Sequence, residues 1–314
     1  MKLTTVIEAY ITLQQSLGLR SKTAKRTLRR FGRQMGDVDM DDIQAEQVLD
    51  FLQGSSPLSS TWRTKYRLLS GLYRFANSRG YVATSPLPPN LPKFPPQQTP
   101  YIYSTQELQR LLDATSVLES ICSRLQAPMF RTLIMLLYGS GLRVSEALEL
   151  TMHDVDLEQR IITVRDTKFY KTRLVPIGPK LALELTALGD RRRLLPMPNG
   201  EDSRFFTSRT GARWDYPRVI TLFQRVRHAA GIKCPPGELR PPRMHDLRHT
   251  AAVHRVIAWY QSGQDVQCLL PKLATYLGHV DISSTQRYLQ MTPELLHEAS
   301  QRFANYANCG GHHD

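Results

Sequence analysis

The first part of the chain alternates between helical apolar patterns and helix-breaking turns. Apolar residues recur at helical spacing over 3–17, and a second helix is predicted to begin after Ser21. A third helix is predicted over 41–52, opened by a pair of aspartates, and a fourth over 61–79. These patterns predict a small helical domain over residues 1–83.

A proline-rich segment follows over residues 84–100. Proline at this density fits neither a helix interior nor a central strand, so the segment is predicted to be a semi-extended linker. It marks the strongest predicted domain boundary in the chain. The second domain is predicted over 101–300, with a C-terminal tail over 301–314.

The second domain shows further helical patterns and one pair of strands. Two short β-branched segments, 160–165 and 173–177, are separated by a turn and predict a β-hairpin. Helices are predicted after a capping box at Ser104, over the apolar run 128–138, from Arg143 to near Leu150, over 179–187 and over about 216–230. The predicted fold is therefore mainly α with a small antiparallel β-sheet.

The charge of the chain indicates what kind of partner it binds. The 314 residues carry a formal net charge of +13, which favours a polyanion, and nucleic acid first. The cations gather on two helices of the first domain, where we predict DNA contacts from Lys22, Lys25, Arg26, Arg29, Arg30, Arg33, Arg63, Lys65 and Arg67. The alternative is that these helices merely present a solvated face.

Several classes of protein are excluded by composition. No apolar run reaches the length of a membrane span, and the N-terminus lacks the apolar core of a signal peptide. The four cysteines are scattered and form no Cys-x-x-Cys pair, which indicates a reducing cytoplasm, and the Cys309-Gly-Gly-His312-His313 end is interpreted as a loose tail and not as a metal site. We expect a cytoplasmic protein without a metal or another cofactor.

Candidate chemistry is concentrated between residues 243 and 290. His245 and Arg248 lie three apart, so a helix places them on one face; together they supply a titratable ring and a two-pronged phosphate ligand. His279 and Tyr288 follow across a glycine turn and a polar helix start. His249 points elsewhere on the helix and is interpreted as structural. A phenol has a pKa of about 10, so nearby cations must activate Tyr288 as a nucleophile.

Upstream segments offer more cations. Arg143 follows a Gly-Ser-Gly-Leu turn at a helix start, and Glu146, one turn along, either holds it in place or forms a surface pair. Lys168 lies between the predicted strands, where a desolvated lysine can give a proton to a leaving oxygen. The alternative is that Lys168, Lys171 and Arg173 only contact DNA phosphates.

These motifs together resemble the tyrosine recombinases, the phage-integrase-like site-specific recombinases. The resemblance covers residues 101–300 closely, and the preceding helical domain more loosely resembles the family's core-binding domain. The matching segments are Gly139-Ser-Gly-Leu-Arg143-Val-Ser-Glu146, Lys168 with Arg173-Leu-Val-Pro-Ile, His245-Asp-Leu-Arg248-His249, Leu277-Gly-His279 and Thr285-Gln-Arg-Tyr288.

The resemblance implies catalytic roles. Arg143 and Arg248 would clamp the scissile phosphate, His279 would hydrogen-bond to it, and His245 would take the proton of Tyr288. Lys168 would protonate the departing 5′ oxygen, and Tyr288 would form a 3′-phosphotyrosine without a metal. The family often has glycines beside this lysine, whereas Thr167 and Phe169 stand here, so Lys171 remains an alternative acid.

The resemblance also implies an assembly. The protein would be a two-domain, C-shaped clamp on double-stranded recombination sites, associated with the nucleoid. It would act as a homo-tetramer through exchange of the amphipathic helix after Tyr288, with packing of that helix on its own domain as the alternative. The reaction would be site-specific recombination of the integrase or transposase type, with integration, excision, resolution and transposition as the possible outcomes. The alternatives are DNA relaxation of the type IB topoisomerase kind and a non-catalytic DNA-binding regulator.

Overall fold

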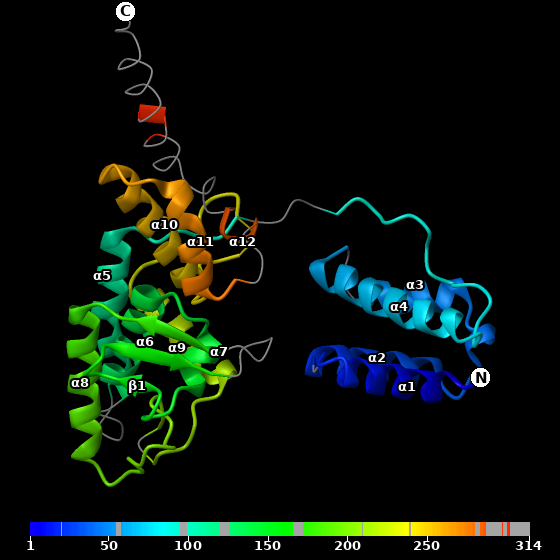
Figure 1. Cartoon of the computed structure of the whole chain (residues 1–314), viewed down its shortest axis with the longest axis horizontal. Coiled ribbons are helices and arrows are strands. Elements are labelled where there is room, and N and C mark those ends of the chain that lie inside the picture. The colour runs from blue at the N-terminus through cyan, green and yellow to red at the C-terminus, as the bar shows by residue number, and fades with distance from the viewer. Residues whose placement is uncertain are drawn as a thin grey trace, which may run out of the picture. The chain divides into compact units, whose positions relative to one another are not determined.

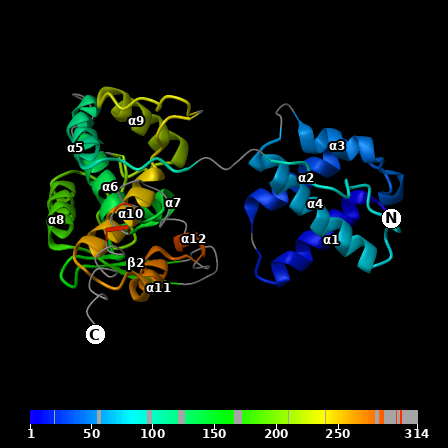
Figure 2. The same cartoon turned by 90° about the horizontal axis from the view of Figure 1, so that it is seen from above.

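The structure is a computed structural model that describes most of the chain. Described are residues 1–19, 21–54, 58–94, 99–119, 126–165, 172–208, 210–238, 240–279, 283–286, 297 and 300–301. The chain divides into two compact units, Met1–Gln98 and Thr99–Asp314 (Figures 1 and 2). This boundary falls inside the predicted linker 84–100. Across the described residues, no helix has both the length and the apolar character that crossing a bilayer requires.

The first unit is helical, as predicted. Its α-helices are α1 (Leu3–Ser16), α2 (Lys22–Met35), α3 (Ala45–Gln53) and α4 (Ser60–Ser78), with a short 3-10 helix η1 (Met40–Asp42). The Ser21 hydroxyl accepts from the Ala24 N–H and caps α2, as expected from the sequence. Trp62 and Tyr73 are 3% and 2% exposed, so both belong to the core of this unit.

The predicted helix over 41–52 is corrected by the structure. Asp41 and Asp42 lie in η1, and the chain is extended at Ile43 (φ −75°, ψ 117°) before α3 begins. Ile43 is buried, and the break lets this side chain reach the core. The cap of α3 is Gln44, which forms a reciprocal capping box with Gln47. Glutamine is not a usual N-cap residue, so no start signal is readable there.

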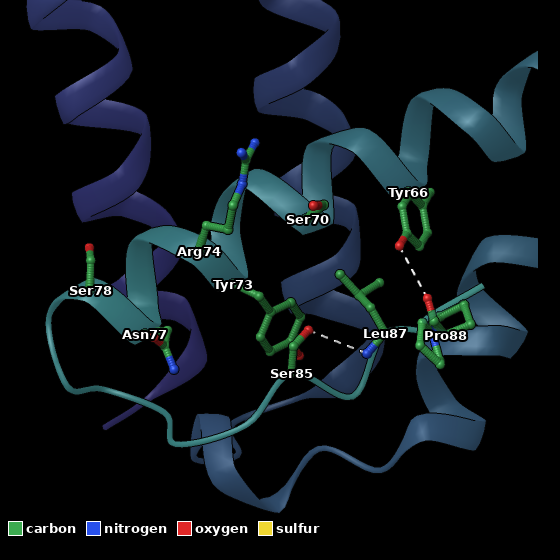
Figure 3. A pocket seen from close by; sticks show the side chains of 10 residues that line it. Tyr66, Ser70, Tyr73, Arg74, Asn77, Ser78, Ser85, Leu87 and Pro88 are labelled. Atoms are coloured by element: carbon green, nitrogen blue, oxygen red, sulfur yellow. Dashed lines mark hydrogen bonds between the residues drawn. The ribbon is translucent and has the colours of Figure 1, made fainter. Parts of the chain in front are cut away.

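Part of the proline-rich segment packs on the first unit. The rings of Phe94 and Trp62 lie 5.5 Å apart, and the Arg63 guanidinium lies 4.2 Å from the Phe94 ring centre. The Tyr66 hydroxyl donates to the Pro88 carbonyl at 3.1 Å. Figure 3 shows the pocket of about 470 Å³ that forms between α4 and this segment. The segment up to Phe94 is therefore anchored to α4.

The second unit combines helices with one small sheet (Figure 1). The very apolar helix predicted over 128–138 is α6 (Gln126–Ser140), which is largely buried and packs against α8 and α10. The remaining helices are α5 (Thr105–Asp113), η2 (Ala114–Leu118), α7 (Val144–Glu149), α8 (Pro179–Arg193), α9 (Tyr216–Ala229), α10 (Asp246–Gln261), α11 (Val266–Leu277) and α12 (Ser283–Gln286). Helix α8 extends six residues beyond the predicted 179–187.

The predicted hairpin is present. Strands β2 (Ile161–Val164) and β3 (Arg173–Pro176) pair antiparallel, with Val164 opposite Arg173. A third strand, β1 (Val155–Asp156), pairs with β2 on its other side and was not predicted, because two residues show no alternation. The register places Arg173 at the start of β3, next to the C-terminal end of α11.

Candidate active site

The start of α7 holds the first candidate arginine. Arg143 is its N-cap residue, and the Arg143 backbone N–H donates to Glu146 Oε2 at 3.0 Å. The Arg143 guanidinium donates to Glu146 Oε1 at 2.6 Å. The side chain of Glu146 is only 10% exposed, so the pair is half-buried and holds Arg143 in place, in contrast to the alternative surface pair.

A second arginine binds the same carboxylate. The Arg173 guanidinium donates to Glu146 Oε1 at 3.1 Å and to Oε2 at 2.7 Å, and its side chain is 11% exposed. Burial alone would raise the pKa of Glu146, but hydrogen bonds from Arg173 and from the Arg143 N–H lower that pKa to about 2. Glu146 is therefore ionised throughout the physiological range.

Three guanidiniums meet at the C-terminal end of α11. The carbonyl of Tyr276 accepts from Arg173 at 3.3 Å, that of Leu277 from Arg248 at 2.7 Å, and that of Gly278 from Arg143 at 3.1 Å. The last carbonyls of a helix have no partner within the helix and carry its partial negative charge, so cations are stabilised there. The same bonds orient the guanidiniums.

Arg248 also joins α10 to the end of α6. Its guanidinium donates to the Gly141 carbonyl at 2.5 Å, and the residue is 3% exposed. Gly141 follows α6 with φ +63°, and a Cβ there would lie 2.6 Å from Leu277. Gly141 thus supplies a conformation and a close approach that other residues do not accommodate. The Gly-Ser-Gly turn is explained by packing as well as by the bend of the chain.

Three histidines surround these arginines. The rings of His245 and His249 lie 5.0 Å apart, edge to face. Burial and the Arg248 guanidinium lower the pKa of His245, and burial and the His245 ring lower that of His249 to about 3. His279 follows α11, and burial together with the Arg248 guanidinium lowers its pKa to about 4. All three rings are neutral at pH 7.

Thr285 is a site residue that the sequence interpretation passed over. It lies on α12, is fully buried, and its hydroxyl is 2.7 Å from Nδ1 of His279. A signal existed, because Thr285 belongs to the quoted motif that ends at Tyr288. The contact ties His279 to the helix that leads toward Tyr288.

The structure thus brings together Arg143, Glu146, Arg248 and His279 from segments far apart in the chain. His245 lies beside them as the residue that precedes α10. Arg173, predicted as a DNA contact, is instead engaged with Glu146 inside this cluster. The other predicted members, Lys168, Lys171 and Tyr288, lie outside the described residues.

The predicted DNA-contacting cations of the first unit differ in their surroundings. Lys65 is partly buried and donates to the carbonyls of Phe51 and Leu52, where it caps the end of α3. Arg29 forms a bidentate pair with Glu8, with 2.7 Å between Nε and Oε1. The side chains of Lys22, Arg26, Arg30, Arg33 and Arg67 are exposed.

Comparison with known proteins places this chain in a family. The model of the Phage integrase family matches residues 103–294. The integrase/recombinase y4rB of Sinorhizobium fredii is 34% identical over 94% of this chain and 95% of its own length. Tyrosine recombinase XerC of Oceanobacillus iheyensis is 30% identical over 78% of this chain and 74% of its own length.

Solved structures share the fold. The Tn1549 transposon integrase in complex with transposon right end DNA has a TM-score of 0.69 at 16% identity, over 98% of this chain and 100% of that one. A lambda integrase tetramer bound to a Holliday junction has a TM-score of 0.65 at 17% identity, over 92% and 77%. The chain belongs to the phage integrase family, the tyrosine site-specific recombinases. The resemblance seen in its motifs is thereby confirmed, and nothing favours the topoisomerase alternative.

Proposed function

We propose that the protein cuts and rejoins double-stranded DNA at specific sites through a 3′-phosphotyrosine, in the integration or transposition of mobile DNA. The observation that carries this proposal is the convergence of Arg143, Arg248 and His279 on the end of α11. A phosphodiester gains charge on its non-bridging oxygens as it is attacked, and preoriented guanidiniums stabilise that charge. The positive charges that stabilise the attacked phosphodiester are supplied by side chains of this protein.

The two arginines play the clamping role. Among the described residues, two of the five N–H groups of the Arg143 guanidinium have partners, and its side chain is 36% exposed. Arg143 therefore presents the remaining N–H groups to a phosphate from the solvent side. Arg248 approaches from α10, held by two carbonyls in a dry setting where its charge is weakly screened.

The histidines are suited to proton transfer and hydrogen bonding. His245 is neutral because burial and Arg248 lower its pKa, so it can accept the phenolic proton of Tyr288. With the Thr285 hydroxyl as the donor to Nδ1 of His279, the neutral ring carries its proton on Nε2 and donates a hydrogen bond from there to a phosphate oxygen.

The covalent step involves two residues outside the described part. The oxygen of Tyr288 attacks phosphorus while its proton passes to His245, and the bond from phosphorus to the 5′ oxygen breaks. Lys168, or Lys171 in its place, gives a proton to the departing 5′ oxygen. The 3′-phosphotyrosine keeps the bond energy, so a 5′ hydroxyl from another strand can reverse the step and complete the exchange.

We extend the proposal to a homo-tetramer on DNA, at the nucleoid. A groove of about 600 Å³ lies between α6, α10 and α11 and is lined by Tyr138, His254, Trp259, Leu273 and Tyr276, among others. Its apolar and aromatic lining suits the apolar face of a helix. We assign it to the segment after Tyr288 of a second copy, for which the sequence predicts an amphipathic helix. The tetrameric state of lambda integrase on a Holliday junction supports a tetramer by likeness of fold.

The proposal is tested by covalent capture. The protein is incubated with fragments of its source genome and quenched with detergent, and the DNA that stays attached is sequenced. Wild type is expected to retain a defined sequence and to do so equally with a chelator present. Tyr288→Phe is expected to bind the recovered DNA but to form no adduct, because its ring has no nucleophilic oxygen. An adduct formed by Tyr288→Phe would refute this nucleophile.

A further inference from the structure

Glu146 is shared by two arginines. Its Oε1 accepts from the guanidiniums of Arg143 and Arg173, and its Oε2 accepts from the Arg143 backbone N–H and the Arg173 guanidinium. Two cations and one anion leave this cluster with a formal charge of +1. The cluster is unevenly exposed, because Glu146 and Arg173 are 10% and 11% exposed while Arg143 is 36% exposed. The surplus charge therefore emerges at Arg143.

Arg173 is also wedged against the end of α11. Its Nε donates to the Tyr276 carbonyl, and a Cβ on Gly278 would lie 2.8 to 3.1 Å from three atoms of its guanidinium. The backbone of Gly278 thus lies directly on the Arg173 guanidinium. Because the Gly278 carbonyl accepts from Arg143, the residue links both arginines to the turn that precedes His279. Arg173 stands five residues after Lys168 in the chain.

We propose that Arg173 is a positioning residue for strand cleavage: it neutralises Glu146 and thereby leaves the charge of Arg143 available to the phosphate. This inference rests on the proposed function. It replaces the prediction that Arg173 contacts DNA phosphates, because all three nitrogens of its guanidinium are engaged, two by the Glu146 carboxylate and one by the Tyr276 carbonyl. Arg173 acts through Arg143 and does not touch the reacting atoms.

Removal of Arg173 changes the electrostatics of the cluster. Glu146 would then pair with Arg143 alone, so the cluster would have a formal charge of zero. A phosphate approaching Arg143 would compete with an undivided carboxylate at 2.6 Å. Replacing Glu146 by glutamine in that background removes the competing charge. Glutamine still accepts from the Arg143 N–H, since capping boxes use either residue.

The test compares cleavage with DNA binding on the nicked form of the duplex recovered by covalent capture. Arg173→Ala is expected to lower the single-turnover rate of adduct formation by about 10²-fold at saturating DNA, as misplacement of a clamping group does. Its Kd for the duplex is expected to stay within about threefold, because Arg173 is not a DNA ligand. The double variant Arg173→Ala with Glu146→Gln is expected to recover about tenfold of the lost rate.

The control is an arginine at the opposite base of the same hairpin. Arg165 pairs with Asp154 at 2.6 Å, away from the cluster, and Arg165→Ala is expected to cleave at a rate close to that of wild type. Urea unfolding is also measured for wild type, for Arg173→Ala and Glu146→Gln alone, and for the double variant. The four free energies of unfolding give the coupling between positions 173 and 146 without any DNA.

Each outcome separates the possibilities. A double variant no faster than Arg173→Ala, or unfolding effects that simply add, would overturn the positioning role. A Kd that weakens as much as the rate would restore Arg173 as a DNA contact. If wild type itself forms no adduct, the proposed function is wrong. The capture experiment that compares wild type with Tyr288→Phe shows this before any Arg173 variant is measured.

Discussion

The protonation state of single residues in this site is determined by their surroundings. His279 and His249 are neutral because burial and neighbouring guanidiniums make a second positive charge unfavourable. Glu146 shows the reverse, since two arginines overcome the effect of burial and hold its pKa at about 2. The residue types were evident from the sequence, but their protonation depends on neighbours that the fold brings together.

The lowered pKa of His279 predicts a pH-dependent stability. The folded ring has a pKa of about 4, while the unfolded ring titrates near 6.5, so below pH 6.5 only the unfolded chain gains this proton. The stabilisation is complete above pH 6.5 and is lost as the pH falls toward 4. His279→Gln should therefore flatten the unfolding free energy against pH in this window, by less than the one-proton limit of about 1.4 kcal/mol per pH unit.

Urea unfolding at several pH values measures this slope. The control is His153→Gln, since His153 is an exposed ring that pairs with Glu201 on the surface. The control should keep the slope of wild type. An unchanged slope in His279→Gln would mean that this ring is not held neutral by its surroundings.

At the scale of elements, the end of α11 organises the site. Three consecutive carbonyls receive three arginines that come from α7, β3 and α10. Gly278 ends the helix in the left-handed region, with φ +69°. The sequence predicts this stop from its Leu-Gly-His pattern. It does not predict that the last turn serves as an acceptor for cations 29 to 135 residues away.

Gly278→Ala tests this arrangement. An alanine in the left-handed region costs about 1 kcal/mol, and its Cβ would also displace the Arg173 guanidinium. Gly263→Ala is the matched control, because Gly263 has φ +70° and no atom within 4 Å of an added Cβ. We expect the free energy of unfolding in urea to fall in both variants by the cost of placing alanine in the left-handed region. Only Gly278→Ala is expected to lose additional stability and most of its cleavage rate. Equal losses in the two variants would show that the Arg173 guanidinium can move aside without affecting stability or cleavage.

Local signals account for what was predicted of the elements. Ser21 and Ser104 cap their helices as the sequence indicates, because a hydroxyl that accepts from a nearby N–H acts within one turn. The break before α3 was missed, since it is driven by burial of Ile43 and not by a local stop. The pairing of Arg173 with Glu146 was also missed, because the two residues lie 27 positions apart and pairing at that distance is a property of the fold.

At the scale of the whole molecule, two units carry different parts of the task. The second unit holds the cluster of arginines and histidines, and the first presents exposed cations on α2. The net charge of +13 favours a nucleic acid partner for the molecule as a whole. Charge alone does not separate cations that meet phosphate from those that serve the protein, as Lys65 shows at the end of α3.

Salt dependence separates these two groups of cations. Binding to an arbitrary duplex of about 30 base pairs should weaken with salt, with a log-log slope that falls by about 0.9 for each phosphate contact removed. Replacing Arg26, Arg30 and Arg33 together by glutamine should reduce the slope, because all three are exposed on α2. Lys65→Gln should lower the stability of the first unit and leave the slope unchanged. If Lys65→Gln reduced the slope as much as an α2 substitution does, Lys65 would be a DNA-contacting residue after all.

The central claim is that a single phenolic oxygen forms the bond to DNA, and mass spectrometry of the adduct tests it most directly. After nuclease and trypsin digestion, the account predicts that the nucleotide remains on the peptide from Tyr288 to Arg302, attached to Tyr288. A nucleotide on Tyr276, on a serine or on any other peptide would contradict it.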